Sequence, residues 1–180
     1  MSLRTPSQTV GPFFHVGLKW EDGHKAAFAS AGERVVLTGQ VFDGAGSLVP
    51  DALIETWQAG PDGKVPAPAP GSKPAGYSRA GTDAEGRYAI ETVMPGACTG
   101  PGGEKYVPQL QVTIFARGLL KALHTRVFLA DPSSRKDDPL GRAAGARAAT
   151  LLAVRDDKDP QTWRWDIRLQ GKDETAFIEN

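Results

Sequence analysis

The sequence predicts a mostly β protein: a two-sheet β-sandwich with an irregular N-terminal arm and one short helical segment. The 21 glycines and 14 prolines among its 180 residues favour short strands joined by turns over long helices. Stretches rich in apolar and β-branched residues recur at short intervals, with turn residues between them. The clearest lies at 162–170, where large apolar residues alternate with charged ones, as in a strand that is buried on one face.

Each element follows from its local pattern. Residues 64–80 and 95–104 are expected to be loops because they are rich in glycine and proline. Residues 131–148 are the best helix candidate, although Gly141 and Gly145 weaken it. Strands are expected at 35–42, 52–58, 87–93, 109–116, 123–130, 150–155 and 162–170. The large side chains expected between the two sheets are Trp57, Phe115, Phe128 and Trp165.

The chain divides into an arm and one domain. Residues 1–30 show no clean periodicity, and Gly11 and Pro12 interrupt any regular element there. We therefore expect an N-terminal arm and interface segment at 1–30. Residues 31–180 are long enough for a single β-sandwich domain with its own core.

Charge and cysteine content exclude several classes of protein. Lys plus Arg and Asp plus Glu both number 21, so the formal net charge is zero, which argues against nucleic-acid binding and against a basic membrane surface. Cys98 is the only cysteine, so an internal disulfide is impossible and a reducing cytoplasm is the simplest location. No apolar run reaches the length of a membrane span, and residues 1–6 lack the apolar core of a signal peptide. A soluble, cytoplasmic protein is expected.

Two glutamines stand where a metal site would be plausible. Gln109 and Gln111 are two residues apart, so on a strand they point to the same face. A His-x-His pair at these positions would offer two imidazoles to one metal, whereas glutamine amides are poor ligands for a transition metal. Taken alone, the pair is most simply the polar face of a half-exposed strand.

Five segments of the sequence, taken in order, form a recognisable set: Thr5-Pro-Ser-Gln-Thr-Val-Gly-Pro-Phe-Phe14, Gly39-Gln-Val-Phe-Asp-Gly44, Glu55-Thr-Trp-Gln-Ala59, Gly81-Thr-Asp-Ala-Glu-Gly-Arg-Tyr88 and Val93-Met-Pro-Gly96. Together they resemble the intradiol ring-cleaving dioxygenases, in particular an alpha-type subunit of that family. The resemblance runs from about residue 5 to the end of the chain, and 107–117 and 124–128 fit the same template. It implies a prealbumin-like core for the sandwich.

The resemblance implies that this chain binds no metal. In the family, two tyrosines and two histidines of the catalytic beta subunit hold a ferric iron. The matching positions here are Val65, Cys98, Gln109 and Gln111, which we interpret as vestigial ligand positions. This chain would then be the non-catalytic alpha subunit of an alpha–beta pair, with no catalytic residue of its own and with Fe(III) bound by the homologous beta subunit.

The resemblance also implies a reaction and a role for the arm. The family's alpha–beta enzymes cleave protocatechuate, a catechol carrying a carboxylate, with O2 between its hydroxyl-bearing carbons. Thr9, Gly11, Pro12 and Phe13 would wall the active site of the beta subunit, or else form a plain arm that only crosses the interface. Arg126 would lie near the site entrance and favour an anionic substrate, or would serve as an interface salt-bridge residue.

Two alternatives stay open. The chain could be a stand-alone prealbumin-like binding module without activity, although such a module has no need of the arm motif. It could also be a dioxygenase whose ligands have moved. Tyr88 is expected in the core, and Tyr77, in the long loop, is not excluded as a ligand. The histidines His15, His24 and His124 show no ligand spacing.

Overall fold

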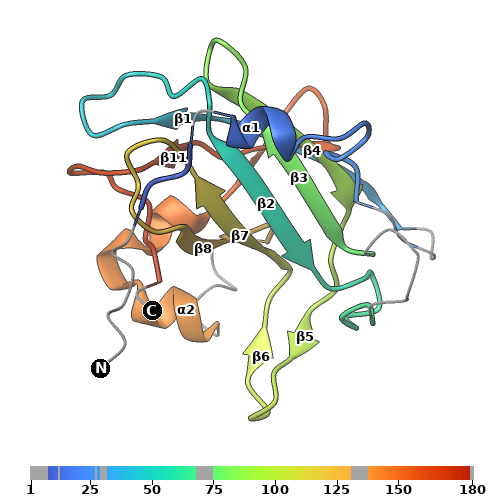
Figure 1. Cartoon of the computed structure of the whole chain (residues 1–180). Helices are drawn as coiled ribbons and strands as arrows, with labels where there is room; N and C mark the ends of the chain where they lie inside the picture. The colour runs from blue at the N-terminus through green and yellow to red at the C-terminus, as the bar shows by residue number, and fades with distance from the viewer. Residues whose placement is uncertain are drawn as a thin grey trace, which may run out of the picture.

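In the computed structural model of the chain, which describes residues 8–11, 13–26, 28, 32–67, 75–130 and 138–178, two β-sheets pack face to face. The predicted β-sandwich is confirmed, and in Figure 1 helix α1 lies at the top, near β2 and β3, whereas α2 lies at the lower left, below β8. The first sheet has the order β11-β1-β10-β9, with β4 also paired to β1. The second has the order β3-β2-β7-β8, and β5 and β6 form a separate hairpin. The strands are β1 (Arg34–Phe42), β2 (Leu53–Gln58), β3 (Tyr77–Gly81), β4 (Arg87–Val93), β5 (Cys98–Thr99), β6 (Lys105–Tyr106), β7 (Gln109–Phe115), β8 (Leu123–Phe128), β9 (Val154–Arg155), β10 (Thr162–Arg164) and β11 (Ile167–Arg168).

The centre of the first sheet is built on a close backbone approach. β1 pairs antiparallel with β4 and parallel with β10 and β11. A Cβ on Gly39 would lie 1.8 Å from the carbonyl oxygen of Trp165, so only glycine fits there. The same oxygen accepts a hydrogen bond of 2.7 Å from the buried phenol of Tyr88. This satisfies the backbone where the predicted strand 162–170 divides into β10 and β11.

Alternation assigns the faces of the second sheet. The side chains of Ile54, Leu110, Ile114 and Val127 point inward and are completely buried in the main core, and burying each contributes about 1.5–3 kcal/mol. On each of these strands, the side chains that alternate with the inward-pointing ones point outward. This outer face includes Glu55, Trp57, Gln111, Arg126 and Tyr77, in strands that are hydrogen-bonded neighbours.

The expected core was partly wrong. Trp165 is buried in the main core, as predicted. Trp57, however, lies on the outer face and is 39% exposed. Phe128 is fully buried, but in a smaller cluster with Leu151 rather than between the sheets. Phe115 is half-buried, on the outward side of β7. A one-residue difference in register decides which face a side chain takes.

The helical and loop assignments also need correction. The helix predicted at 131–148 is described only from residue 138, where α2 (Pro139–Ala143) is followed by a 3-10 helix, η2 (Gly145–Leu151). The expected strand at 150–155 is reduced to β9 because η2 occupies its first residues. Strands β3, β5 and β6 formed in or beside segments expected to be loops. The arm contains one turn of helix, α1 (Phe14–Gly17).

The arm is fastened to the sandwich. The amide of Arg79 donates to the carbonyl of Gly23 at 2.7 Å, and Ala26 donates to Glu91 at 2.8 Å. Residues 29–31, where the arm was predicted to end, lie outside the described part of the chain, so that boundary stays a prediction. Among the helices described, none is long and apolar enough to cross a bilayer.

Candidate functional site

A cavity of about 260 Å³ opens at the start of β7, on the outer face of the second sheet. Gln111 is the register partner of Trp57 on β2 and of Arg126 on β8, so the three side chains form one row across the sheet. The β5–β6 hairpin contributes Cys98 and Tyr106 to the lining. Residues from four separate parts of the sequence therefore meet at one place.

All four vestigial positions line this cavity. Gln109 and Gln111 come from β7, Cys98 from β5 and Val65 from the turn after β2. They are up to 46 residues apart in the sequence, and the fold brings them together. Their role as former ligand positions stays a prediction, while their convergence is a feature of the structure.

The side chains at these positions do not fit a ferric ion. Val65 has no donor atom, Cys98 supplies a single thiol, and the two glutamines supply neutral amides. Ferric iron is a hard cation, better served by phenolate, carboxylate and imidazole than by this set. Within the described ranges, no three His, Cys, Asp or Glu side chains gather closely enough to hold a metal.

Gln109 is engaged in a buried polar contact instead. It is only 9% exposed, and its Nε2 lies 3.4 Å from Oδ2 of Asp138. Asp138 is fully buried and caps α2, accepting hydrogen bonds from the amides of Leu140 and Gly141 through Oδ1. Sequence reasoning missed Asp138, although an Asp directly before a Pro is a helix-start signal.

Arg126 lines this cavity. Its guanidinium stacks on the ring of Tyr106, 4.8 Å from the ring centroid. Of the lining residues that the structure describes, Arg126 alone is charged. Tyr106 and Trp57 form part of the same wall.

Tyr77 is poorly suited to bind iron. Its ring packs against Trp57 at 4.9 Å and stacks with Trp20 at 6.1 Å. Burial, followed by the neighbouring Glu55, raises the pKa of the Tyr77 phenol to about 12. A tyrosinate ligand has to lose this proton, so the surroundings of Tyr77 oppose the role. Burial likewise raises the pKa of Tyr88 well above its usual value, and its place in the core confirms the prediction.

The histidines do not converge on this cavity. Nε2 of His24 lies 3.8 Å from Glu91, and Nδ1 of His124 lies 3.2 Å from the hydroxyl of Thr113. Neither residue lines the cavity. The side chain of His15 lies outside what the structure describes.

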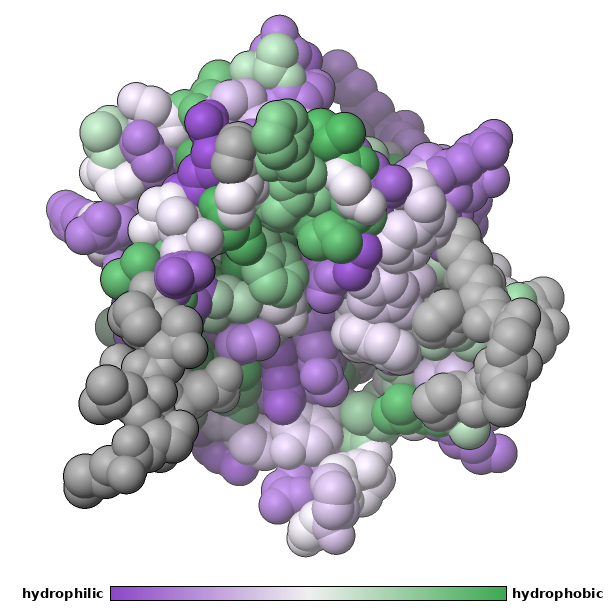
Figure 2. Space-filling model, in the orientation of Figure 1, coloured by the Kyte–Doolittle hydropathy of each residue, from purple (hydrophilic) through white to green (hydrophobic). Residues whose placement is uncertain are grey.

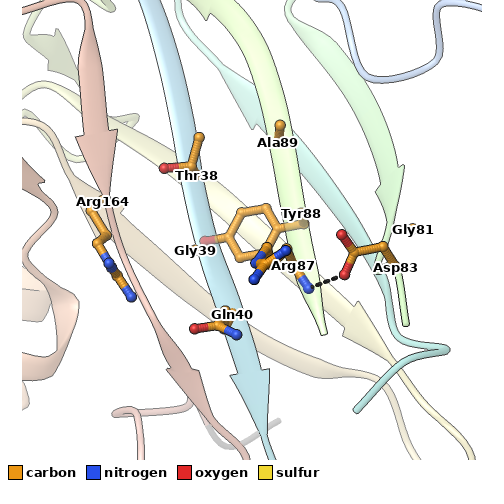
Figure 3. A pocket seen from close by; sticks show the side chains of 9 residues that line it. All are labelled: Thr38, Gly39, Gln40, Gly81, Asp83, Arg87, Tyr88, Ala89 and Arg164. Atoms are coloured by element: carbon orange, nitrogen blue, oxygen red, sulfur yellow. Dashed lines mark hydrogen bonds between the residues drawn. The ribbon is translucent and has the colours of Figure 1, made fainter. Parts of the chain in front are cut away.

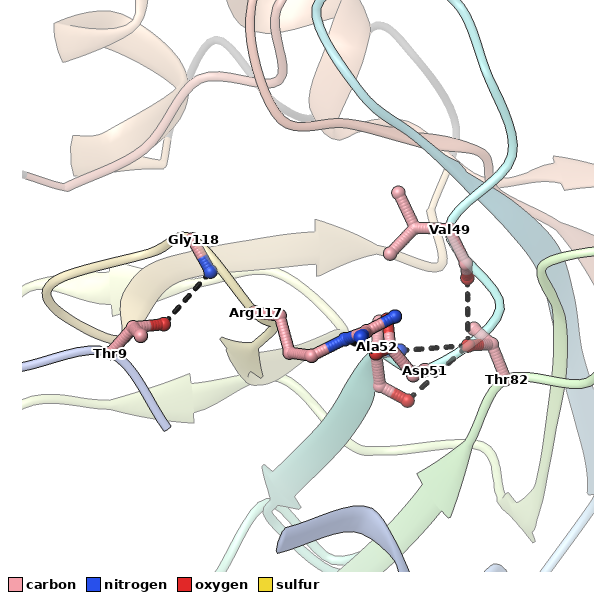
Figure 4. A network of polar contacts seen from close by, with 7 residues as sticks. All are labelled: Thr9, Val49, Asp51, Ala52, Thr82, Arg117 and Gly118. Atoms are coloured by element: carbon pink, nitrogen blue, oxygen red, sulfur yellow. Dashed lines mark hydrogen bonds and ion pairs between the residues drawn. The ribbon is translucent and has the colours of Figure 1, made fainter. Parts of the chain in front are cut away.

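Thr9, one of the predicted wall residues of the arm, lies at the opposite end of β7. The Thr9 hydroxyl accepts a hydrogen bond of 2.8 Å from the amide of Gly118, just beyond the strand (Figure 4). The distance from Gln111 to the end of the strand at Phe115 is itself about 14 Å at 3.4 Å per residue. Gly11 accepts a hydrogen bond from Phe14 at 3.1 Å, and Pro12 lies outside the described residues.

The arm presents apolar side chains to solvent. Phe13 is 79% exposed, and Val16, Leu18 and Trp20 are also exposed. Apolar residues gather around α1 in the view of Figure 2. Exposed large apolar side chains that cluster in this way mark a surface that another molecule covers.

A second hollow, of about 560 Å³, lies on the first sheet and contains none of the predicted site residues. Figure 3 shows Thr38 and Gln40 of β1 beside Arg87 of β4, with Arg164 of β10 across the strand. It is wider and more open than the cavity at β7. The amide of Arg87 donates to Asp83 at 2.8 Å, as part of a turn.

Comparison with known proteins gives the class of this chain. Residues 11–171 match the family model described as a dioxygenase, and the chain belongs to the intradiol dioxygenase family. It is 37% identical to the protocatechuate 3,4-dioxygenase alpha chain of Burkholderia cepacia, with 98% of this chain and 97% of the relative covered. It is 31% identical to the beta chain from the same organism, over 81% of this chain and 68% of the relative.

The solved structure of hydroxyquinol 1,2-dioxygenase from Pseudomonas putida has the same fold. It superposes with a TM-score of 0.65 at 20% identity, covering 81% of this chain and 59% of that one. At this level of identity the match supports the architecture, while the family assignment rests on the sequence relatives.

Proposed function

We propose that this chain is the iron-free alpha subunit of a protocatechuate 3,4-dioxygenase, whose homologous beta subunit binds Fe(III). The observation that carries the proposal is the cavity at β7. Val65, Cys98, Gln109 and Gln111 meet there, and none of them suits ferric iron. The similarity to both alpha and beta chains supports a pair made of two related subunits.

The proposed enzyme acts in the cytoplasm and converts protocatechuate and O2 to 3-carboxy-cis,cis-muconate. Both atoms of O2 enter the product, one at each carbon of the cleaved bond, so the reaction needs no external reductant. The iron chemistry belongs to the beta subunit, and no bond-making step is assigned to a residue of this chain. The alpha subunit contributes the shape of the pocket and the assembly of the pair.

Residues 1–30 act in this proposal as the interface arm of the 31–180 domain. Phe13 supports this role because its exposed ring offers a flat apolar surface to an aromatic substrate or to the partner. Thr9 fixes the arm through its bond to Gly118. Pro12 restricts the backbone, and Gly11 has no Cβ, which lets the main chain come close to a ligand.

Arg126 was predicted to act with the arm at the partner's site. The structure places its side chain in the cavity at β7, away from Thr9. Arg126 and the arm would therefore approach a beta subunit from separate places. The contact of Arg126 with substrate in the partner stays a prediction.

Co-expression with a beta chain tests the proposal. The chain alone should contain no iron and show no protocatechuate-dependent oxygen uptake, whereas the purified pair should contain iron and be active. In the pair, Phe13→Ala should lower kcat/KM about tenfold, which corresponds to about 1.4 kcal/mol. Val16→Ala, a change at another exposed apolar residue of the arm, is the matched control and should stay within about twofold.

Two outcomes would count against the proposal. Iron binding and turnover by the chain alone would show that ligands have moved. A chain that stays monomeric at high concentration and does not associate with any beta chain would favour the stand-alone binding module. The exposed apolar arm leads us to expect self-association of the isolated chain instead.

A further inference from the structure

The cavity at β7 is lined by one cationic side chain, that of Arg126. Arg126 is half-buried, and among the described residues no Asp or Glu lines the cavity with it. Within the part of the chain that the structure describes, its contact is the stacking on Tyr106 rather than an ion pair. A partly desolvated guanidinium without a carboxylate favours an anionic ligand.

The stacking leaves Arg126 available for such a ligand. The guanidinium of Arg126 stacks with its face over the Tyr106 ring, 4.8 Å from the ring centroid. Its N–H groups lie in the plane of the guanidinium and are therefore not covered by the ring. Those N–H groups match the two oxygens of a carboxylate. Gln111, its register partner on β7, adds an amide beside the same place.

The remaining lining selects for a flat, compact molecule. Trp57 and Tyr106 provide aromatic surface, and Val65 and Cys98 provide apolar surface. The volume of about 260 Å³ lies just below the range of about 300–1,000 Å³ that is typical for drug-sized ligands. A single aromatic ring carrying a carboxylate fits both the size and the chemistry.

Gln109, which also lines the cavity, has one polar atom without a partner among the described residues. Its Nε2 is directed toward the buried Asp138, so its Oε1 must accept from elsewhere. Among the described residues no donor reaches this Oε1, although the side chain is nine-tenths buried. An unpartnered buried acceptor costs about 1–3 kcal/mol.

We propose that the cavity of this iron-free chain is itself a binding site for a small aromatic carboxylate, held by Arg126 without metal and without chemistry. The site goes beyond the proposed function and does not depend on it, because every residue in it belongs to this chain. The substrate acid of the family and unrelated benzoates share the required chemistry.

The test is a titration of the full chain with 4-fluorobenzoate, followed by fluorine NMR, alone and in the co-expressed pair. Saturable binding below about 10 mM is expected. Arg126→Gln should weaken it at least about tenfold by removing the fork. Gln111→Glu should do the same, because the new carboxylate would pair with Arg126. Arg164→Gln, on the other sheet, is the control and should leave binding unchanged. Thermal melting checks that each variant is folded.

The ligand is varied in parallel. 4-Fluorophenol, which lacks the carboxylate, should bind at least about tenfold more weakly than 4-fluorobenzoate. Protocatechuate should displace 4-fluorobenzoate if the natural ligand is the substrate acid, and failure to displace it would assign the site to another benzoate. The proposal is overturned if the folded chain shows no saturable binding. It is also overturned if binding occurs only in the pair and is insensitive to Gln111→Glu, because the site would then be the partner's.

Discussion

The two ends of strand β7 are held by different kinds of contact. At its start, Gln109 lies against the fully buried Asp138, which also caps α2. At its end, the amide of Gly118 reaches the hydroxyl of Thr9 on the arm through an exposed hydrogen bond. Arg117 pairs with Asp51 beside it, also near the surface (Figure 4).

The contacts at the start and at the end of β7, about 20 Å apart along the strand, therefore serve two different purposes. Buried polar contacts at the start fix the shape of a cavity that belongs to this chain alone. Exposed contacts at the end hold an arm whose apolar side chains face outward. The first region can keep its geometry without a partner, whereas the second presents a surface that a partner would complete.

The largest effect is expected at the start of the strand. Asp138→Ala removes the cap of α2 and leaves Nε2 of Gln109 without its acceptor. The combined loss should be about 2–4 kcal/mol in the free energy of unfolding, measured with urea. Asp138→Asn keeps one oxygen for the cap and should lose about half as much. A loss below about 0.5 kcal/mol for Asp138→Ala would mean that the buried contact does not hold this end.

A pH dependence should mark the aromatic row beside the cavity. The folded state raises the pKa of Tyr77 to about 12 from its usual 10. Between these values the unfolded chain releases the proton while the folded chain keeps it, so stability falls as pH rises through the window. Tyr77→Phe should flatten that part of the slope, measured by urea unfolding at several pH values. An unchanged slope would show that the phenol is not shielded by burial and Glu55.

Much of the strand arrangement could be predicted from the sequence, and the strands and faces that could not be predicted depend on contacts between distant segments. Alternation placed β1, β4, β7 and β8 nearly at their observed bounds, because each is a locally readable strand. Strand β3 was missed because its pairing with β2 is set by contacts outside the segment. Trp57 was assigned to the core although its spacing with Glu55 placed both on one face, and the register to β7 decides that this face is the outer one.

Some residues of the site could likewise be predicted from the sequence, whereas the contacts between them could not. The resemblance named Val65, Cys98, Gln109 and Gln111, and the structure adds that they share one cavity. The contacts of Tyr106 with Arg126 and of Asp138 with Gln109 became visible only in the structure, because they join segments that are distant in sequence. No local pattern predicts that Arg126 lies beside the start of β7 and Thr9 beside its end.

The smallest effect is expected at the arm. Thr9→Val removes the acceptor for the Gly118 amide, and an exposed hydrogen bond of this kind contributes about 0.5–1 kcal/mol. The global free energy of unfolding should therefore change little. Hydrogen exchange of the Gly118 amide should accelerate, because the arm opens locally without unfolding the sheet. Thr9→Ser keeps the hydroxyl and should preserve the protection. If Thr9→Val destabilised the whole fold as much as Asp138→Ala, the arm would be part of the rigid body, and the two ends of β7 would not differ in the way argued above.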